Sequence, residues 1–386
     1  MNGTARRLDF EFRISIGLRI SDFSMIASMS RESLKNVSRI VVKLGTGVLT
    51  DAKKKPDLAQ MTQLVAQTAA LRKAGKEVLI VTSGAVGAGM GVLGHTKRPG
   101  ELAKMQACAA VGQSRLMATY EKLFAEFELN VGQVLLTHDD LQHHERHLNA
   151  RNTLVTLLEH GVVPIINEND AISFTELKFG DNDKLSALVA CLLPADLLVI
   201  LTTVDGVIEN FGKENPKTIN IIEHIDEALE KMAGGTTSDT SVGGMASKVQ
   251  AAKIVARAGI PLVIASGRKK KVLANILQGD DEGTLFVPHA IKLPGRKRWI
   301  AFFHAPRGTI YVDDGCKQAL REKGTSLLPP GVTRCEGRFS AGEVVRVCDT
   351  NGTEFARGIS YFNSDALKTR DLPRTEVIHR DNLVLL

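Results

Sequence analysis

Short apolar runs alternate with segments of helical periodicity from Arg39 onward, and this alternation restricts the fold more than any other feature of the chain. The predicted strands cover 40–43, 78–81, 131–136, 162–166, 197–201 and 261–265, and the predicted helices cover about 58–74, 101–128, 146–159, 183–193 and 245–258. Apolar strands that alternate with helices are typical of a parallel sheet covered on both faces. The sequence therefore predicts an α/β fold.

A second domain is expected after this unit, because 386 residues exceed what one ordinary hydrophobic core serves. A basic stretch that contains Pro and Gly, at 288–305, is interpreted as a linker. From 306 to 386, short strands, many glycines and one helix at Asp314–Lys323 indicate a compact, mostly β module. We therefore expect a disordered extension at 1–36, the larger α/β domain at 37–287 and the small module at 306–386.

Composition and charge favour a cytoplasmic globular protein. The five cysteines lack C-x-x-C or Cys/His finger spacing, which argues against a disulfide framework and for a reducing compartment. No apolar run approaches the roughly 18 residues of a membrane span, so no membrane partner is expected. The net charge of +6 suits anionic ligands but is weak evidence for nucleic acid, since a solvated surface explains the basic runs at 268–271 and 296–298.

Two dense clusters of amides and carboxylates flank a predicted hairpin at 171–179. Asn167–Asp170 ends one strand, and Gly180–Asp183 opens the next helix. Such groups are costly to order unless they hold something polar. Asp170 can receive an ammonium group, and Asn182 can bind both a carboxylate and an ammonium, because an amide donates and accepts. For either cluster alone, a capped Asx-rich turn is the structural alternative.

Two lysines stand beside glycines at predicted ligand-binding turns. Lys43 ends the first strand and Gly45 comes just after it, and ligands of open parallel sheets collect at the carboxyl ends of strands. Lys248 ends the run Gly-Gly-Met-Ala-Ser-Lys at 243–248. Glycines there let backbone N–H groups approach phosphate oxygens. Ser83 follows the second strand at a helix start, where it suits an anion-binding role, an N-cap or both.

Other nucleotide and metal signatures are absent or weak. The chain contains no G-x-x-x-x-G-K-[ST] motif, and the G-x-G-x-x-G at 89–94 does not directly follow a strand, so it is interpreted as a chance match. His143 and His147 are four residues apart but lack the H-E-x-x-H pattern. A charged, solvated helix start is the preferred interpretation of that segment.

Taken together, the motifs occur in an order that resembles the glutamate 5-kinases, which are amino acid kinases. The matching segments are 41–46, 81–85, 109–116, 167–170, 180–183 and 243–248. The later module resembles a PUA domain through 312–315, 324–329 and 342–345. The resemblance implies a three-layer α/β/α sandwich with a mainly parallel central sheet, the amino acid kinase fold, followed by a small, mostly β PUA-like domain.

The resemblance also implies roles for individual residues. It implies a catalytic role for Lys43, Lys248 and Asp183, in which Asp183 orients the two lysines. It implies glutamate binding by Ser83, Asp170 and Asn182. The residues expected at ATP are Lys43, Gly45, Thr202, Thr203, Val242, Gly243, Gly244, Met245, Ala246, Ser247 and Lys248. No protein ligand is assigned to a metal. Departures from the residues common in the family occur at Gly47, Thr203, Val242 and Ser247, and none removes a charged group.

The implied reaction is phosphorylation of the γ-carboxylate of L-glutamate by ATP with Mg²⁺, which gives L-glutamyl 5-phosphate in the first step of proline biosynthesis. The nucleophile has a reference pKa of about 4.3 and needs no general base. Because an anion must approach a polyanion, Lys43 and Lys248 are expected to neutralise charge. Implied partners are a reductase that takes the labile product, proline as a feedback inhibitor sensed around 171–180, and copies of the chain in a dimer or tetramer.

Two alternatives stay open. One is a kinase for acetylglutamate, aspartate or another small acid. The other is an RNA-binding protein that acts through the PUA-like domain, which carries Phe339, Phe355, Tyr361 and Phe362. A β module needs such aromatic residues for its own core, so they do not favour RNA by themselves.

Overall fold

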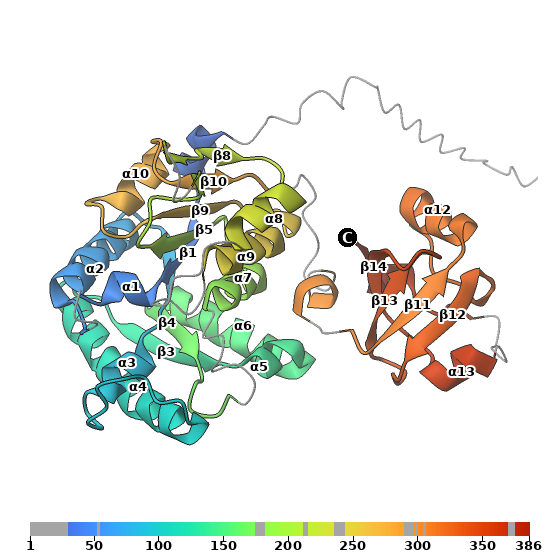
Figure 1. Cartoon of the computed structure of the whole chain (residues 1–386), viewed down its shortest axis with the longest axis horizontal. Coiled ribbons are helices and arrows are strands. Elements are labelled where there is room, and N and C mark those ends of the chain that lie inside the picture. The colour runs from blue at the N-terminus through green and yellow to red at the C-terminus, as the bar shows by residue number, and fades with distance from the viewer. Residues whose placement is uncertain are drawn as a thin grey trace, which may run out of the picture.

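The computed structural model describes residues 30–51, 55–173, 182–210, 215–234, 244–288, 297, 299–303, 306–369 and 375–386. These residues form a larger unit on an eight-stranded sheet and a smaller unit on a five-stranded sheet (Figure 1). A short antiparallel ribbon joins β6 (Ile208–Glu209) to β7 (Lys217–Thr218). No helix in the described part of the chain is long and apolar enough to cross a membrane.

The large sheet has the strand order β3-β4-β2-β1-β5-β9-β10-β8. Its strands are β1 (Arg39–Leu44), β2 (Glu77–Val81), β3 (Val131–Leu136), β4 (Val163–Glu168), β5 (Leu197–Thr202), β8 (Ile221–Ile222), β9 (Leu262–Ser266) and β10 (Thr284–Phe286). All neighbouring pairs are parallel except β9 with β10. The predicted, mainly parallel sheet is confirmed.

Helices cover both faces of the large sheet, as expected for a sheet whose strands are apolar throughout. Along β1, Ile40 and Val42 pack with α2 and α4, whereas Val41 packs with α7 and α9 on the other side. The helices are α1 (Thr46–Leu49), α2 (Leu58–Lys73), α3 (Ala85–Met90), α4 (Leu102–Ala125), α5 (His138–Gln142), α6 (His144–Glu159), α7 (Asn182–Leu192), α8 (Glu227–Gly234), α9 (Met245–Arg257) and α10 (Val272–Gln278). The unit is therefore the expected α/β/α sandwich.

The smaller unit is mostly β, as predicted. Its strands, in sheet order, are β12 (Val332–Gly337), β11 (Gly308–Val312), β13 (Val344–Cys348), β14 (Glu354–Ile359) and β15 (Leu383–Leu385). Its helical segments are α12 (Asp314–Lys323), η4 (Pro329–Gly331), α13 (Ser364–Thr369) and η5 (Arg380–Asn382). Phe339 and Phe355 are buried in its core, so these two rings are not presented for stacking on RNA bases.

The folded chain begins before residue 37. Arg31–Asn36 form a short 3₁₀ helix, η2, in which Leu34 is fully buried. The Arg31 guanidinium donates to the backbone carbonyls of Asn220 and Gly283 at 2.9 and 2.7 Å, and to two further carbonyls nearby. The expected disordered extension at 1–36 therefore includes residues 31–36 wrongly. These residues are ordered because Leu34 is buried and Arg31 binds four backbone carbonyls of the large unit.

Part of the expected linker is also packed. Trp299–Phe303 form one turn of π-helix, η3, and Ile300 is fully buried in the same apolar cluster as Val344 of the small unit. Phe303 meets the ring of His147 edge-on, with ring centroids 4.5 Å apart. His147 is consequently buried and not solvated as predicted, since the segment that covers it comes from far along the chain.

Candidate active site

Lys43 and Lys248 converge on the carboxylate of Asp183. Lys43 lies at the carboxyl end of β1, and its Nζ is 2.5 Å from Asp183 Oδ1. Lys248, in the second turn of α9, donates from Nζ to Asp183 Oδ2 at 2.9 Å. Ser247 Oγ donates to the same oxygen at 2.7 Å. The two ammonium groups therefore face one buried carboxylate although they are far apart in the sequence.

Asp183 carries a negative charge in this surrounding. Burial alone would raise the pKa of its carboxyl, since the side chain is only 1% exposed, but Lys43 and Lys248 outweigh this effect and hold the pKa below its usual range. Asp183 stands in the first turn of α7, where the helix dipole also favours an anion. The carboxylate is thus well suited to hold two cations at a fixed separation.

Two glycines stand near the lysines in the sequence, and one of them, Gly45, lies close to Lys43 in the structure. A Cβ at Gly45 would lie 3.2 Å from the carbonyl oxygen of Leu201 and 3.8 Å from Lys43 Nζ. Gly244 has extended backbone and precedes the first residue of α9, Met245. Backbone N–H groups near these glycines can approach a bound anion, as at helix N-termini in general.

The nucleotide side of the predicted site is described in part. Thr202 ends β5, and exposed Thr203 follows it. Ala246 is exposed, whereas Gly244, Met245 and Ser247 are half-buried, and Val242 and Gly243 lie outside the described residues. A Cβ at Gly47 would lie 2.8 Å from Thr203 Cγ2, so two of the departures from the family pattern lie against each other.

Ser83 and Asn182 are anchored to the strand ends. Ser83 Oγ donates to the carbonyl oxygen of Leu44 at 2.9 Å and accepts from Thr46 Oγ1 at 3.1 Å. It is not the N-cap of α3, because Gly84 takes that position with a positive φ of 100°. Asn182 Nδ2 donates to the carbonyl oxygen of Thr82 at 2.5 Å.

An amide chain runs from Asn182 to Gln113 on α4. Asn182 Nδ2 also donates to Asn167 Oδ1 at 2.7 Å, and Asn167 Nδ2 donates to Gln113 Oε1 at 2.8 Å. Asn167 and Gln113 lie within the sequence motifs, but no role is predicted for either from the sequence. The available signal was a glutamine directly after Gly112 on a helix that packs against the sheet.

Close helix packing brings Gln113 to this place. A Cβ at Gly112 would lie 1.8 Å from the carbonyl oxygen of Ala85, and a Cβ at Gly89 would lie 1.9 Å from the carbonyl oxygen of Cys108. Only glycine permits such contact, so α3 and α4 meet through their backbones. Gln113, the next residue on α4, is consequently buried at 8% exposure.

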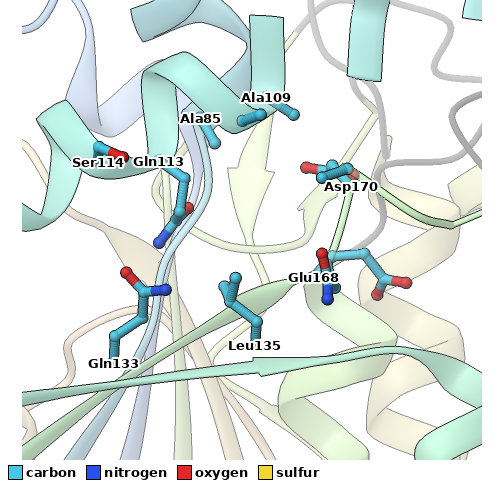
Figure 2. A pocket seen from close by; sticks show the side chains of 11 residues that line it. Ala85, Ala109, Gln113, Ser114, Gln133, Leu135, Glu168 and Asp170 are labelled. Carbon is cyan, nitrogen blue, oxygen red and sulfur yellow. The ribbon is translucent and has the colours of Figure 1, made fainter. Parts of the chain in front are cut away.

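A cavity of about 200 Å³ lies between α4 and the carboxyl ends of β3 and β4. Gln113, Gln133, Glu168 and Asp170 are among the residues that line it (Figure 2). Burial raises the pKa of Asp170 to about 6, against the opposing effect of Arg98. The cavity therefore combines amide groups with a carboxylate that is ionised at neutral pH. Most of the predicted hairpin at 171–179 lies outside the described residues.

The described residues contain no group of three or more His, Cys, Asp or Glu side chains that could hold a metal ion. Asp183 is engaged by two lysines and a hydroxyl. In proteins, Mg²⁺ is usually bound through one or two carboxylates together with the phosphates of a nucleotide.

Comparisons with known proteins show which families the two units of the chain resemble. The model of the amino acid kinase family matches residues 38–266, and that of the PUA domain matches residues 308–380. A glutamate 5-kinase from Geobacter sulfurreducens is 47% identical over 369 residues, which cover 92% of this chain and 99% of that protein. A glutamate 5-kinase from Escherichia coli is 46% identical over 331 residues, which cover 85% of this chain and 90% of that protein.

Among solved structures, carbamate kinase from Giardia lamblia bound to AMP-PNP has a TM-score of 0.50 at 20% identity and covers 66% of this chain and 100% of its own. That likeness concerns the fold alone, whereas the sequence matches extend over both units. The chain therefore belongs to the amino acid kinase family and, within it, to the glutamate 5-kinases.

Proposed function

We propose that the protein transfers the γ-phosphoryl group of ATP to the γ-carboxylate of L-glutamate and so makes L-glutamyl 5-phosphate. The observation that carries the proposal is the convergence of Lys43 and Lys248 on Asp183. Two cations fixed by one buried carboxylate form a preorganised clamp for the charge of a transferring phosphoryl group. The glutamate 5-kinases among the relatives support the choice of acceptor.

For this reaction the protein needs only to position the two substrates and to neutralise negative charge. A glutamate side chain is ionised at neutral pH, so attack on phosphorus needs no general base. A lysine Nζ has three donors, and at Lys43 the contact with Asp183 occupies only part of this capacity, which leaves N–H groups for phosphate oxygens. Mg²⁺, when bound with the nucleotide, supplies further positive charge along the phosphates.

Residues at the edge of the sheet would hold the amino acid. Asp170, which lines the cavity, suits the α-ammonium of glutamate. Ser83 and Asn182 are anchored beside the strand end that carries Lys43 and would complete the glutamate site. Because Nδ2 of Asn182 already donates to Thr82 and Asn167, its acceptor Oδ1 suits the ammonium group. Thr202, Thr203 and the chain around 244–248 would contact the nucleotide.

The proposal extends to a partner enzyme, to an inhibitor and to self-association of the chain. An acyl phosphate is labile, so a reductase that accepts it directly is a suitable partner in proline synthesis. Proline shares the α-carboxylate and the ammonium of glutamate and would compete for the same groups. Self-association of the chain into a dimer or tetramer is part of the same proposal.

An ADP-release assay with ATP and Mg²⁺ tests the function. Glutamate should support turnover, whereas acetylglutamate, which lacks the ammonium group, and aspartate, which is one methylene shorter, should not. Lys43→Ala and Lys248→Ala should each lower kcat at least about a hundredfold, as expected for the loss of a charge-stabilising donor. Exposed Lys231→Ala, which loses only a surface ion pair, is the control and should keep the wild-type rate. Wild-type turnover in either active-site variant would refute the mechanism.

A further inference from the structure

The cavity beside Asp170 contains a buried hydrogen-bond donor whose use the proposed roles do not explain. Gln113 lines the cavity and is 8% exposed. Among the residues that the structure describes, its Nε2 has no hydrogen-bond partner. A buried amide N–H group is costly to leave unpaired, so a donor in this position points to a ligand that accepts from it.

The orientation of the Gln113 amide is determined by groups that cannot be reversed. The backbone N–H of Glu168 can only donate, and it donates to Asn167 Oδ1 at 3.0 Å. At the other end of the chain, the carbonyl of Thr82 can only accept, and it accepts from Asn182 Nδ2. Both constraints require Asn167 to present Nδ2 to Gln113 Oε1, so Nε2 is the atom that remains for the cavity.

The cavity therefore contains both a hydrogen-bond donor, Gln113 Nε2, and a carboxyl group, that of Asp170. Figure 2 shows Gln113 entering the space from α4 and Asp170 from the chain that follows β4. The side chain of Glu168 extends away from Gln113, and its carboxylate lies 3.5 Å from Ser173 Oγ and 4.0 Å from His138 Nδ1. An α-amino acid carries an ammonium and a carboxylate on one carbon, and the two walls of the cavity complement these two groups.

We infer that Gln113 Nε2 donates to the α-carboxylate of the bound amino acid and is a specificity-determining residue of the site. This inference rests on the proposed function. The amide chain through Asn167 and Asn182 connects this recognition to the strand ends, because a displaced Gln113 leaves Asn167 Nδ2 without its acceptor.

Steady-state kinetics of three variants test the inference. Gln113→Glu keeps an oxygen for Asn167 Nδ2 but replaces the donor by an acceptor, and Gln113→Leu removes both. Each should raise the KM for glutamate at least about tenfold, while the KM for ATP stays within about twofold and kcat within about threefold, as expected when ground-state binding is lost. Gln67→Leu is the matched control: its Nε2 is also buried without a partner among the described residues, but it does not line the cavity. Its KM for glutamate should not change.

Competition experiments identify the group that Gln113 contacts. 4-Aminobutyrate lacks the α-carboxylate, so its inhibition constant against glutamate should change less than about twofold in Gln113→Glu. A wild-type KM for glutamate in both Gln113 variants, or equal weakening of glutamate and 4-aminobutyrate, would overturn the inference and leave the proposed function intact. Absence of glutamate-dependent ADP release in the wild type would instead refute the proposed function itself.

Discussion

Replacement of Asp183 by Asn should destabilise the protein strongly. The carboxylate is 1% exposed and lies 2.5 Å from Lys43 Nζ and 2.9 Å from Lys248 Nζ, so the variant removes the buried negative charge that both ammonium groups contact. Loss of one partner from a buried ion pair costs about 3–5 kcal/mol. At roughly 2–4 °C per kcal/mol for a unit of this size, Tm should fall by about 6–20 °C.

Thermal unfolding followed by circular dichroism measures this effect, with Glu230→Gln as the control. Glu230 pairs with Lys253, which stands on the same helix as Lys248, but its side chain is 33% exposed. Its loss should cost less than about 1 kcal/mol. AMP-PNP should raise the Tm of Asp183→Asn more than that of the wild type, because the phosphates replace the missing negative charge.

The pH dependence of the stability gives a second check on the role of Asp183. Because the folded pKa of Asp183 is depressed, its stabilising contribution is present above the unfolded pKa of 3.8 and is lost only as the pH falls toward the folded value. The stability difference between wild type and variant should therefore persist from pH 8 down to about pH 4. A cost of less than about 1 kcal/mol at pH 7, equal to that of Glu230→Gln, would refute the reasoning.

Two further predictions concern the cavity and the nucleotide side. The pKa of about 6 at Asp170 predicts that kcat/KM for glutamate falls about tenfold per unit as the pH drops below 6, since the protonated acid no longer attracts an ammonium. In a pH–rate series, Asp170→Asn should lower the plateau at least about tenfold and abolish this fall; an unchanged profile would contradict the role. Gly47→Ser should cost about 1 kcal/mol in urea unfolding through contact with Thr203 Cγ2. Thr203→Ser, which removes that methyl, should restore the stability, and an additive double variant would exclude the contact.

The parts of the molecule that follow from local pattern could be predicted from the sequence. The apolar run that ends in Lys43 is a buried strand, and in a parallel sheet its carboxyl end meets the ends of its neighbours. For the same reason the polar cluster at Asn167–Asp170 lies on the same edge as Lys43. Asp183 opens a helix, so its place near this edge was also accessible.

Residues that depend on tertiary contact were not predictable in this way. Gln113 looks like a surface residue of an amphipathic helix, but it is buried where α4 meets α3 through the backbone contact at Gly112. His147 looks solvated until η3, more than a hundred residues later, covers its ring. Arg31 could not be assigned to the fold because its acceptors are backbone carbonyls, which leave no trace in a sequence pattern.

The crossing of α3 and α4 has a consequence for how substrate choice can change. The reach of the Gln113 amide depends on how near two main chains approach at Gly89 and Gly112. Even a single methyl group at either position would lift α4 and withdraw the amide from its neighbour Asn167. Substitutions at residues that do not contact a ligand can thus change the substrate specificity. Further substitutions of the side chains that line the cavity would not restore it, because they do not return α4 to its place.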